Sequence, residues 1–397
     1  MGTPQYISGL DFDQELRADA LALMRRLVAN FEHKTTDQAP DQYVEPIANY
    51  RDPQLWTREM AAIHRRVPLP VALSCELPEP GTHKAMDVVG HPVLLTRDRS
   101  GVAHAMLNVC RHRGGELVPA GLGKTNRLTC PYHAWSYDLG GRLIGVYGEE
   151  TFGPVDRGAM SLITLPVAER AGFIFISLDR ETTIDLDAWL GDLAPLLDGL
   201  ALDRCFHHRT TYLPGPNWKL VVDGYLEGYH FASLHRTTVF RTNHSNMATF
   251  DAYGPHMRVA FALRTIGASV GAAEATWQPA TSVGPIYWLF PGIAIAGGWR
   301  RLVEVSIVLP GTSWDTSMTE QHTLLRHPPV DDDEVKQADH ASAWFYEVTL
   351  DEDYRTGEGI QRGLAAGGDG QFVFGRNEPG VQHFHRTIAQ LLAVAAR

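Results

Sequence analysis

A stripe of apolar residues at helical spacing lies near the N-terminus. Its members, three or four positions apart, are Leu16, Ala20, Leu23, Leu27 and Phe31. This spacing predicts an amphipathic helix over residues 13–31. Asp11 and Asp13 stand at its start and are of a residue type that caps helix N-termini. The polar stretch from His33 to Gln42 has no such periodicity and is expected to be a linker.

Short apolar runs replace the helical spacing from about residue 43 to residue 170. Glycine, aspartate and proline separate these runs, as in chains of strands joined by turns. The runs at 93–96 (Val-Leu-Leu-Thr) and, just beyond the segment, at 172–176 (Gly-Phe-Ile-Phe-Ile) are typical of β-strands. The pattern therefore predicts a small all-β domain.

The rest of the chain mixes helical and strand patterns. After a connecting helix near Leu186 to Leu200, we expect a helical stretch at 217–235, strands between 247 and 327, and helices at 333–363 and at the C-terminus. This order favours an α+β domain with an antiparallel sheet covered by helices. Since 397 residues exceed the usual size of one core, we expect two domains. They are the all-β domain, 43–170, and the larger domain, 171–397, on which the N-terminal helix and linker, 1–42, are expected to pack.

Composition and charge exclude several classes of protein. With 44% hydrophobic and 20% charged residues the chain resembles ordinary globular proteins, and no apolar run is long enough to span a membrane. A net charge of -11 argues against binding nucleic acid. The N-terminus lacks the features of a signal peptide, and only four cysteines occur. The protein is therefore expected in the reducing cytoplasm.

Four residues with metal-binding side chains form two short, matching motifs. Cys110-Arg-His112 is followed, after seventeen residues, by Cys130-Pro-Tyr-His133. Each motif offers one thiolate and one imidazole. Such a set suits zinc or an iron–sulfur cluster. In a Rieske [2Fe–2S] centre, one iron takes both cysteines and the other both histidines, so a mixed pair in each loop favours that cluster; zinc sites more often pair like ligands within a loop.

A second set of candidate ligands lies in the segment N-W-K-L-V-V-D-G-Y-L-E-G-Y-H-F-A-S-L-H at 217–235. Glu227 and His230 are three positions apart and share a helix face, whereas His235 drifts off that face. Either the helix ends before His235 or a π-type irregularity turns it back. Two imidazoles and a carboxylate that leave coordination positions open are typical of non-haem Fe(II) oxygenases.

The chain resembles the Rieske non-haem iron ring-hydroxylating oxygenases, in their terminal oxygenase alpha subunit. The resemblance rests on N-V-C-R-H-R-G-G-E-L at 108–117, L-T-C-P-Y-H-A-W-S-Y at 128–137, the carboxylate, His230 and His235 spacing, and the C-terminal Phe384-His385. It implies that Cys110, His112, Cys130 and His133 bind the [2Fe–2S] cluster. It also implies that His230 and His235 bind a mononuclear Fe(II).

The resemblance also implies roles for three acidic positions. Asp353, before Glu358 and Gln361, matches the third iron ligand of the family, with Asp351 and Glu352 as alternates. Glu227 takes the place of a carboxylate, usually Asp, that links the iron site to a cluster histidine, here His133, of a neighbouring subunit. Glu at that position is associated with choline- and carnitine-type monooxygenases. Asp223-Gly224 stands where Glu-Asn is common, so this chain lacks the amide side chain that the family has near the iron.

The implied reaction uses O2 and a small organic substrate. The candidates are cis-dihydroxylation or monohydroxylation of an aromatic compound, and, as the alternative, oxidative N- or O-demethylation or hydroxylation of a quaternary amine; an electron carrier without catalysis would need only the β domain. No G-x-G-x-x-G fingerprint follows a strand, so NADH or NADPH is expected to act through a separate flavin or ferredoxin-type reductase. The resemblance further implies a homotrimer, with a separate beta subunit as an option. Candidate pocket residues are Phe240, Phe290, Ile295 and Trp299.

Overall fold

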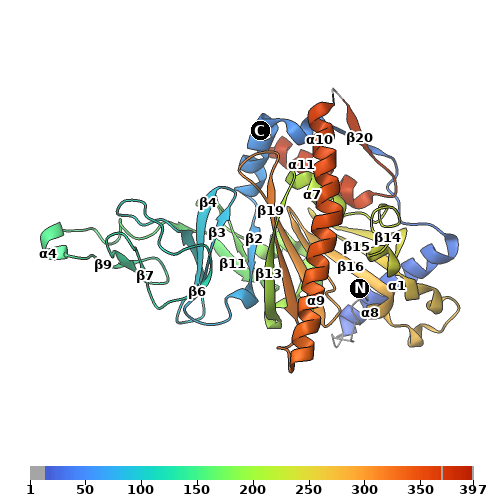
Figure 1. Ribbon diagram of the computed structural model, residues 1–397, viewed down its shortest axis with the longest axis horizontal. Coiled ribbons are helices and arrows are strands. Elements are labelled where there is room, and N and C mark those ends of the chain that lie inside the picture. The colour runs from blue at the N-terminus through green and yellow to red at the C-terminus, as the bar shows by residue number, and fades with distance from the viewer. Residues whose placement is uncertain (1–13, 368–369, 396–397) are drawn as a thin grey trace. The chain divides into compact units, whose positions relative to one another are not determined.

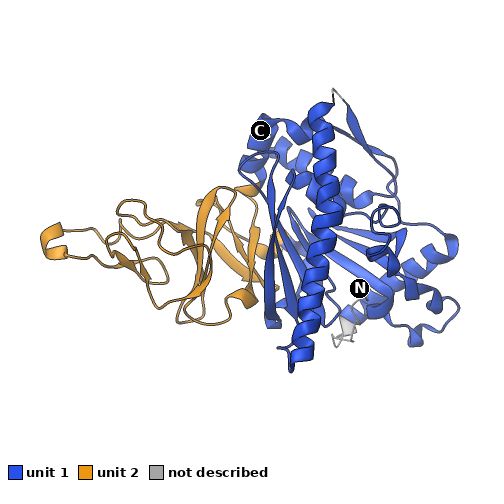
Figure 2. Ribbon diagram, in the orientation of Figure 1, with its two compact units in different colours: residues 1–63, 190–397 blue, residues 64–189 orange. Residues whose placement is uncertain are grey.

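The structure is a computed structural model that describes residues 14–367 and 370–395. It divides into two compact units, residues 64–189 and residues 1–63 with 190–397 (Figure 2). We call them the β unit and the α+β unit. Every strand pair in the described residues is antiparallel. The fold class expected from the sequence is thus confirmed.

The β unit contains three small sheets. Their strand orders are β10-β5-β4-β3-β6, β11-β12-β2 and β7-β8-β9. The elements are β2 (Leu69–Leu73), β3 (Thr82–Val88), β4 (His91–Arg97), β5 (Ala103–Leu107), β6 (Gly121–Lys124), β7 (Leu128–Thr129), β8 (Ser136–Tyr137), β9 (Leu143–Gly145), α4 (Glu149–Phe152), β10 (Thr164–Leu165), β11 (Val167–Arg170) and β12 (Phe173–Ile176). The apolar runs that predict strands at 93–96 and 172–176 correspond to β4 and β12. Within this unit, β7, β9 and α4 lie at one end (Figure 1).

A seven-stranded sheet forms the centre of the α+β unit. Its order is β13-β19-β18-β17-β16-β15-β14. The bounds are β13 (Phe206–Gly215), β14 (Asn243–Tyr253), β15 (His256–Leu263), β16 (Val283–Leu289), β17 (Ile293–Ala296), β18 (Leu302–Pro310) and β19 (Ser317–Leu325). Six of these strands follow one another in the order of the chain, from β14 to β19, so hairpins build most of the sheet. The strands expected between 247 and 327 are found here.

Helices cover this sheet. The elements α9 (Asp332–Val348), η8 (Thr349–Tyr354) and α10 (Arg355–Ala366) follow one another in one long rod, whose α9 part crosses the sheet over β13 and β19 (Figure 1). The turn η8 is a π-helix. The remaining helices are α2 (Ala48–Arg51), α3 (Pro53–Glu59), α5 (Leu186–Leu190), α6 (Ala194–Gly199), α7 (Trp218–Tyr225), α8 (Pro279–Ser282) and α11 (Pro379–Ala395). The helix expected near 186–200 is therefore broken into short pieces.

The N-terminal helix α1 (Gln14–His33) packs on the same unit. Leu16, Ala20, Leu23 and Leu27 of the apolar stripe are buried, whereas the proposed caps Asp11 and Asp13 lie outside the described residues. On its polar side, Arg26 donates to Asp251 at 2.5 Å. Packing of the apolar stripe fixes this helix against β14. None of the described helices is long and apolar enough to cross a bilayer.

The unit bounds differ from the expected 43–170 and 171–397 at both ends. Residues 43–63 belong to the α+β unit, because β1 (Tyr43–Pro46) pairs with β20 (Gln371–Phe374) and the buried Lys219 donates to Glu59 at 2.5 Å. Residues 171–189 belong to the β unit, because β12 pairs with β11 and β2. Strand pairing between distant segments thus sets both bounds.

Candidate metal centres

Two similar loops in the β unit present the four residues of the first motif. Cys110 follows β5, and its N–H donates to Gly115 O at 2.8 Å; Cys130 follows β7, and its N–H donates to Trp135 O at 2.8 Å. Each loop is thus closed by a backbone hydrogen bond from its cysteine. Gly115 lies where the two loops approach each other, since a Cβ there would be in van der Waals contact with Cys130 Sγ, at 3.4 Å.

The side chains in these loops fit a [2Fe–2S] cluster. Cys110 and Cys130 are buried and form no disulfide, so both thiols are free to act as ligands. The rings of His112 and His133 lie 4.8 Å apart, and each Nδ1 atom is buried without a hydrogen-bond partner among the described residues. A buried imidazole nitrogen without a partner is costly. Coordination to an iron would satisfy both nitrogens.

Neighbouring aromatic residues shield and polarise this site. The ring of Trp135 stacks on His112 at 4.8 Å. The hydroxyl of Tyr137 lies 3.4 Å from Cys110 Sγ and accepts from the N–H of Arg111 at 3.1 Å. Burial and the hydrogen bond to Cys110 raise the pKa of Tyr137, so this phenol stays protonated and can donate to sulfur. Hydrogen bonds to cluster sulfurs tune the reduction potential.

His230 and His235 lie in an irregular segment after α7. The helix expected at 217–235 ends at Tyr225, and the chain then turns without regular structure to residue 238. Gly228 permits this course, because a Cβ there would lie 2.7 Å from the ring of Phe261. Of the two alternatives for turning His235 back, the early end of the helix is correct.

Three ligand atoms meet at this point. His230 Nε2 lies 3.0 Å from His235 Nε2, and Asp353 Oδ1 lies 3.0 Å from His235 Nε2 and 3.7 Å from His230 Nε2. Ligands in neighbouring positions of an octahedral ion, with bonds of about 2.1 Å, are about 3 Å apart. The three atoms therefore fit one face of such an ion and leave the opposite face open.

Asp353 reaches the histidines from the π-helical turn η8. A π-turn adds a residue to the helix and changes the direction of the side chains that follow. Of the alternates, Asp351 pairs instead with Arg355 at 2.8 Å and its side chain is 46% exposed, and Glu352 hydrogen bonds to Nδ1 of His235. Only Asp353 among these three lies beside both Nε2 atoms.

Carboxylates hold the outer nitrogen of each histidine. Glu227 accepts from His230 Nδ1, and Glu352 accepts from His235 Nδ1 and from Thr238 Oγ1, the latter at 2.7 Å. Burial lowers the pKa of His235, but hydrogen bonds with Asp353 and Glu352 outweigh it and raise the pKa overall. Such carboxylate–histidine pairs fix the ring orientation and increase the basicity of the nitrogen that faces a metal.

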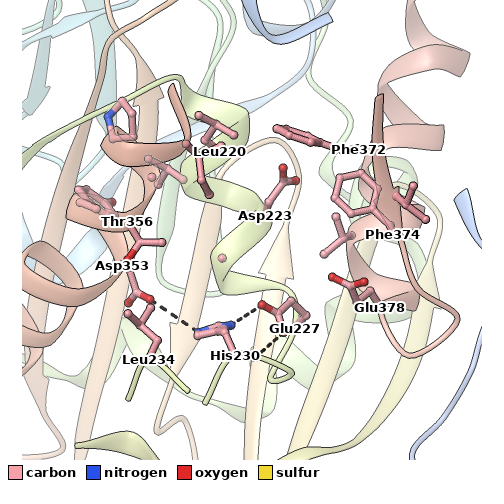
Figure 3. Close-up of a pocket in the computed structure, with 18 residues that line it drawn as sticks. Leu220, Asp223, Glu227, His230, Leu234, Asp353, Thr356, Phe372, Phe374 and Glu378 are labelled. Atoms are coloured by element: carbon pink, nitrogen blue, oxygen red, sulfur yellow. Dashed lines mark hydrogen bonds and ion pairs between the residues drawn. The ribbon is translucent and has the colours of Figure 1, made fainter. Parts of the chain in front are cut away.

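A cavity of about 360 Å³ lies on the Glu227 side of this site. Figure 3 shows Asp223, Glu227 and Glu378 around it, with His230 between Glu227 and Asp353. Burial, with the nearby carboxylates Glu227 and Asp223, raises the pKa of Glu378 to about 7. The cavity is therefore acidic on one wall, and its other walls are largely apolar.

Asp223, whose position is unusual for the family it resembles, is tied into a buried network. Its Oδ2 accepts from the hydroxyl of Tyr50 at 2.6 Å, and its Oδ1 lies 2.8 Å from His385 Nε2. His385 belongs to the Phe384-His385 pair near the C-terminus. Asp223 thus joins α7 to the N-terminal segment and to α11 beside the cavity.

A second cavity, of about 200 Å³, lies between the sheet and α9 on the other side of the histidines. His230, His235 and Asp353 border it. Of the four pocket residues expected from the sequence, Trp299 lines it, whereas Phe290 and Ile295 are buried in the core and Phe240 is outside the wall. Its polar wall residues include Glu304 and Gln321, which the sequence analysis missed.

Comparisons with known proteins agree with the two sites. Residues 67–154 match the model of the Rieske [2Fe-2S] domain, and residues 202–394 match that of the ring hydroxylating alpha subunit (catalytic domain). Together the two models match most of the chain. Each matched range contains one of the candidate metal sites.

Two curated relatives and one solved structure illustrate the similarity. The carnitine monooxygenase oxygenase subunit of Escherichia coli (strain K12) is 28% identical over 87% of this chain and 93% of its own. The large subunit of anthranilate 1,2-dioxygenase from Acinetobacter baylyi is 32% identical over 54% of this chain and 48% of its own. The crystal structure of the quaternary ammonium Rieske monooxygenase CntA with an inhibitor has a TM-score of 0.76 and 25% identity, and covers 89% of this chain and 96% of that one.

The matched models, the relatives and the fold agree on one assignment. The β unit carries the cluster motif, the α+β unit carries the two-histidine, one-carboxylate site, and similar proteins combine both domains in one oxygenase subunit. The chain belongs to the Rieske non-haem iron oxygenases, as a terminal oxygenase alpha subunit.

Proposed function

We propose that His230, His235 and Asp353 bind the mononuclear iron, and that Cys110, His112, Cys130 and His133 bind the [2Fe–2S] cluster. The observation that carries this proposal is the meeting of three ligand atoms at 3.0, 3.0 and 3.7 Å. When bound, the iron offers open positions for O2 and one electron, and the cluster supplies the second electron.

The chain's own side chains prepare these positions. Glu227 and Glu352 hold the outer nitrogen of each histidine, so the Nε2 atoms stay aimed at a common point. The cavity between the sheet and α9 places a substrate on the open face of the site. Its aromatic and aliphatic wall residues would limit the access of water to a bound substrate.

The substrate class that the relatives favour is a small quaternary amine. The relative that matches along most of its length acts on carnitine by its name, and CntA is named for quaternary ammonium compounds. Hydroxylation of a carbon beside nitrogen gives an unstable product that releases an aldehyde, so monooxygenation leads to cleavage of the C–N bond. Glu227, rather than Asp, agrees with this class.

Oxidation of an aromatic compound is the second candidate. One relative is an anthranilate dioxygenase subunit. In this chain the cavity wall contains the flat side chains of Phe231, Phe261 and Trp299, which suit an aromatic ring. The two candidate substrate classes differ in charge. Analysis of the products formed from trimethylammonium compounds and from aromatic compounds distinguishes them.

The electrons come from a separate reductase that oxidises NADH or NADPH. The carboxylate of Glu227 borders the acidic cavity and is 13% exposed, so it is placed to receive a partner's group. We infer that it accepts from His133 of a neighbouring subunit in a homotrimer. Electrons would then pass from the cluster of one subunit to the iron of the next.

The test is oxygenation by the full-length protein. The purified chain is supplied with a ferredoxin-type reductase, NADH, 18O2 and a panel of trimethylammonium and aromatic compounds, and products are analysed by mass spectrometry. Formaldehyde, or another aldehyde, formed together with the shortened amine and in equal amount to the NADH consumed supports the amine reaction. Labelled phenols or dihydrodiols support the aromatic reaction. The absence of both the aldehyde with its amine and any labelled aromatic product, with iron and labile sulfide present, would contradict the proposal.

A further inference from the structure

A buried carboxylate without a cationic partner faces the cavity between the sheet and α9. Glu304 lies on β18 and is 4% exposed. No basic side chain in the described part of the chain forms an ion pair with it. Its carboxylate accepts from Ser306 Oγ at 2.6 Å, and Gln321 provides a second hydrogen bond. Glu304 therefore has hydrogen bonds on the sheet but no counter-ion among the residues that the structure describes.

The alternation of β18 shows which way this side chain points. Leu302 and Glu304 border the cavity, and the intervening Val303 does not. On β19, Gln321 pairs in register with Ser306 and also borders the cavity, whereas Glu320 pairs with Ile307 and does not. Side chains at alternate positions share one face of a sheet. Glu304 thus lies on the cavity face, beside the site that holds His230 and Asp353.

Aromatic side chains surround the same space. Those on the cavity wall are Tyr225, Phe231, Phe261, Trp299, Trp344 and Phe345. The faces of aromatic rings attract cations, most strongly in sites shielded from water. A carboxylate and several aromatic rings on the wall of one cavity are two elements that recognise an alkylammonium group. A neutral aromatic substrate would be recognised by the rings alone.

We propose that Glu304 is the specificity-determining residue of this cavity and serves as the counter-ion of a substrate ammonium group. This inference rests on the proposed oxygenase function and deepens it, because it names the charge that the substrate carries. A buried carboxylate without a partner is costly. An ammonium group held among the aromatic rings would compensate that cost.

The protonation behaviour of the site agrees with this role. Burial raises the pKa of Glu304 to about 7, and hydrogen bonds from Ser306 and Gln321 only partly offset the effect of burial. Burial, together with the nearby charge of Glu304, raises the pKa of the phenols of Tyr225 and Tyr354, so both phenols stay neutral near pH 7. A cation placed beside Glu304 favours the ionised carboxylate. The charge of Glu304 therefore depends on pH and on what binds beside it. The other charged residues on the wall of this cavity are Arg300, Glu227 and Asp353.

A pair of molecules with the same shape and different charge tests the proposal. Choline carries a trimethylammonium group, and 3,3-dimethylbutan-1-ol carries a neutral tert-butyl group in its place. Dissociation constants are measured by calorimetry at pH 8 on the full-length protein under argon, for the wild type and for Glu304→Gln, Glu304→Asp and Glu320→Gln. Glu320→Gln is the matched control, since it changes a buried carboxylate on the opposite face of the sheet.

We expect the wild type and Glu320→Gln to bind choline at least about tenfold more tightly than the neutral alcohol. Glu304→Gln should lose this preference while its affinity for the alcohol changes less than about threefold, and Glu304→Asp should retain part of it. Equal affinities in the wild type would overturn the proposal without any variant. An unchanged preference in Glu304→Gln would do the same.

Binding and turnover separate this inference from the function on which it rests. If choline binding depends on Glu304 but no compound is oxygenated, the proposed function fails and the cation site stands. If aromatic compounds are oxygenated and choline is not preferred, the oxygenase function stands and the role of Glu304 is wrong.

Discussion

The Nε2 atoms of His230 and His235 lie 3.0 Å apart although neither residue belongs to a regular helix. The separation results from the end of α7 at Tyr225 and from the irregular turns that follow. Each ring is oriented from behind by a carboxylate, Glu227 or Glu352. Because both supports come from outside the α7 helix, the geometry of the pair depends on tertiary structure rather than on helical spacing.

Glu352 should control the affinity for iron without being a ligand. In Glu352→Gln the side chain keeps its shape but loses its charge, so the outer nitrogen of His235 is held less strongly. We expect iron affinity to fall by about 10- to 100-fold, as for other carboxylates behind a ligating histidine. Titration of the iron-free protein with Fe(II) under argon measures the change.

The matched control is Asp351→Asn, one residue away. Asp351 pairs with Arg355 on the surface of the same turn, so its loss of charge should leave iron affinity within about twofold. A larger loss of iron affinity in Asp351→Asn than in Glu352→Gln would contradict the assignment of Glu352, rather than Asp351, as the carboxylate that supports His235.

The cluster should depend on both histidines of the β unit. His112→Cys and His133→Cys replace the nitrogen ligand of the outer iron by sulfur, and histidine ligation is what raises the potential of a Rieske centre. We therefore expect each variant to lose the Rieske-type electron paramagnetic resonance signal, whether or not a cluster remains. Wild-type protein with zinc and without labile sulfide would rule out the cluster.

Choline affinity should rise with pH through the titration of Glu304. Burial raises the pKa of this carboxyl to about 7, so it is mostly neutral at pH 6 and mostly ionised at pH 8. Because only the ionised form attracts the cation, affinity should increase by about tenfold between these values. Glu304→Gln should show no such increase, and the neutral alcohol should bind equally at both. A pH profile that is identical in wild type and variant would contradict this assignment.

Glu227 should be needed for electron transfer in addition to its hydrogen bond with His230. Because that hydrogen bond supports an iron ligand, Glu227→Gln should weaken iron binding as Glu352→Gln does, so the variant is assayed with its iron site loaded by excess Fe(II). Under these conditions we expect an intact cluster and product formation at least about a hundredfold slower, equivalent to roughly 2.7 kcal/mol of barrier. Mixed oligomers of Glu227→Gln and His133→Cys chains should regain part of the activity. At some of their interfaces, the intact Glu227 of a His133→Cys chain meets the intact His133 of a Glu227→Gln chain. Full activity of Glu227→Gln, or of a monomer, would contradict transfer between subunits.

The sequence was sufficient for features that depend on local spacing. The stripe from Leu16 to Leu27 predicts α1, and alternating short runs predict the antiparallel sheets. The Cys110–His112 and Cys130–His133 motifs predict two matching loops because each carries its whole set of donors in three or four residues. In each case the deciding residues are neighbours in the chain.

Features that depend on distant contacts were not predictable in the same way. The pairing of β1 with β20 joins residues that lie more than three hundred positions apart, and it moves residues 43–63 into the α+β unit. Close packing of Gly228 on Phe261 accompanies the early end of α7. Glu304 did leave a signal, because it is a single carboxylate within the apolar run Leu302-Val-Glu-Val-Ser-Ile-Val. A role for this carboxylate in binding could be inferred only once the structure showed that Glu304 borders the cavity.

A single-turnover experiment tests most directly whether oxygenation takes place at His230, His235 and Asp353. The wild-type chain and Asp353→Ala are loaded with iron, reduced chemically, freed of reductant, and exposed to 18O2 with the substrate identified in the panel, in the absence of any reductase. We expect up to about one product molecule per iron site from the wild type, and no product from Asp353→Ala, which should keep its cluster but lose the mononuclear iron. Product from Asp353→Ala at the wild-type yield would contradict the assignment of this site.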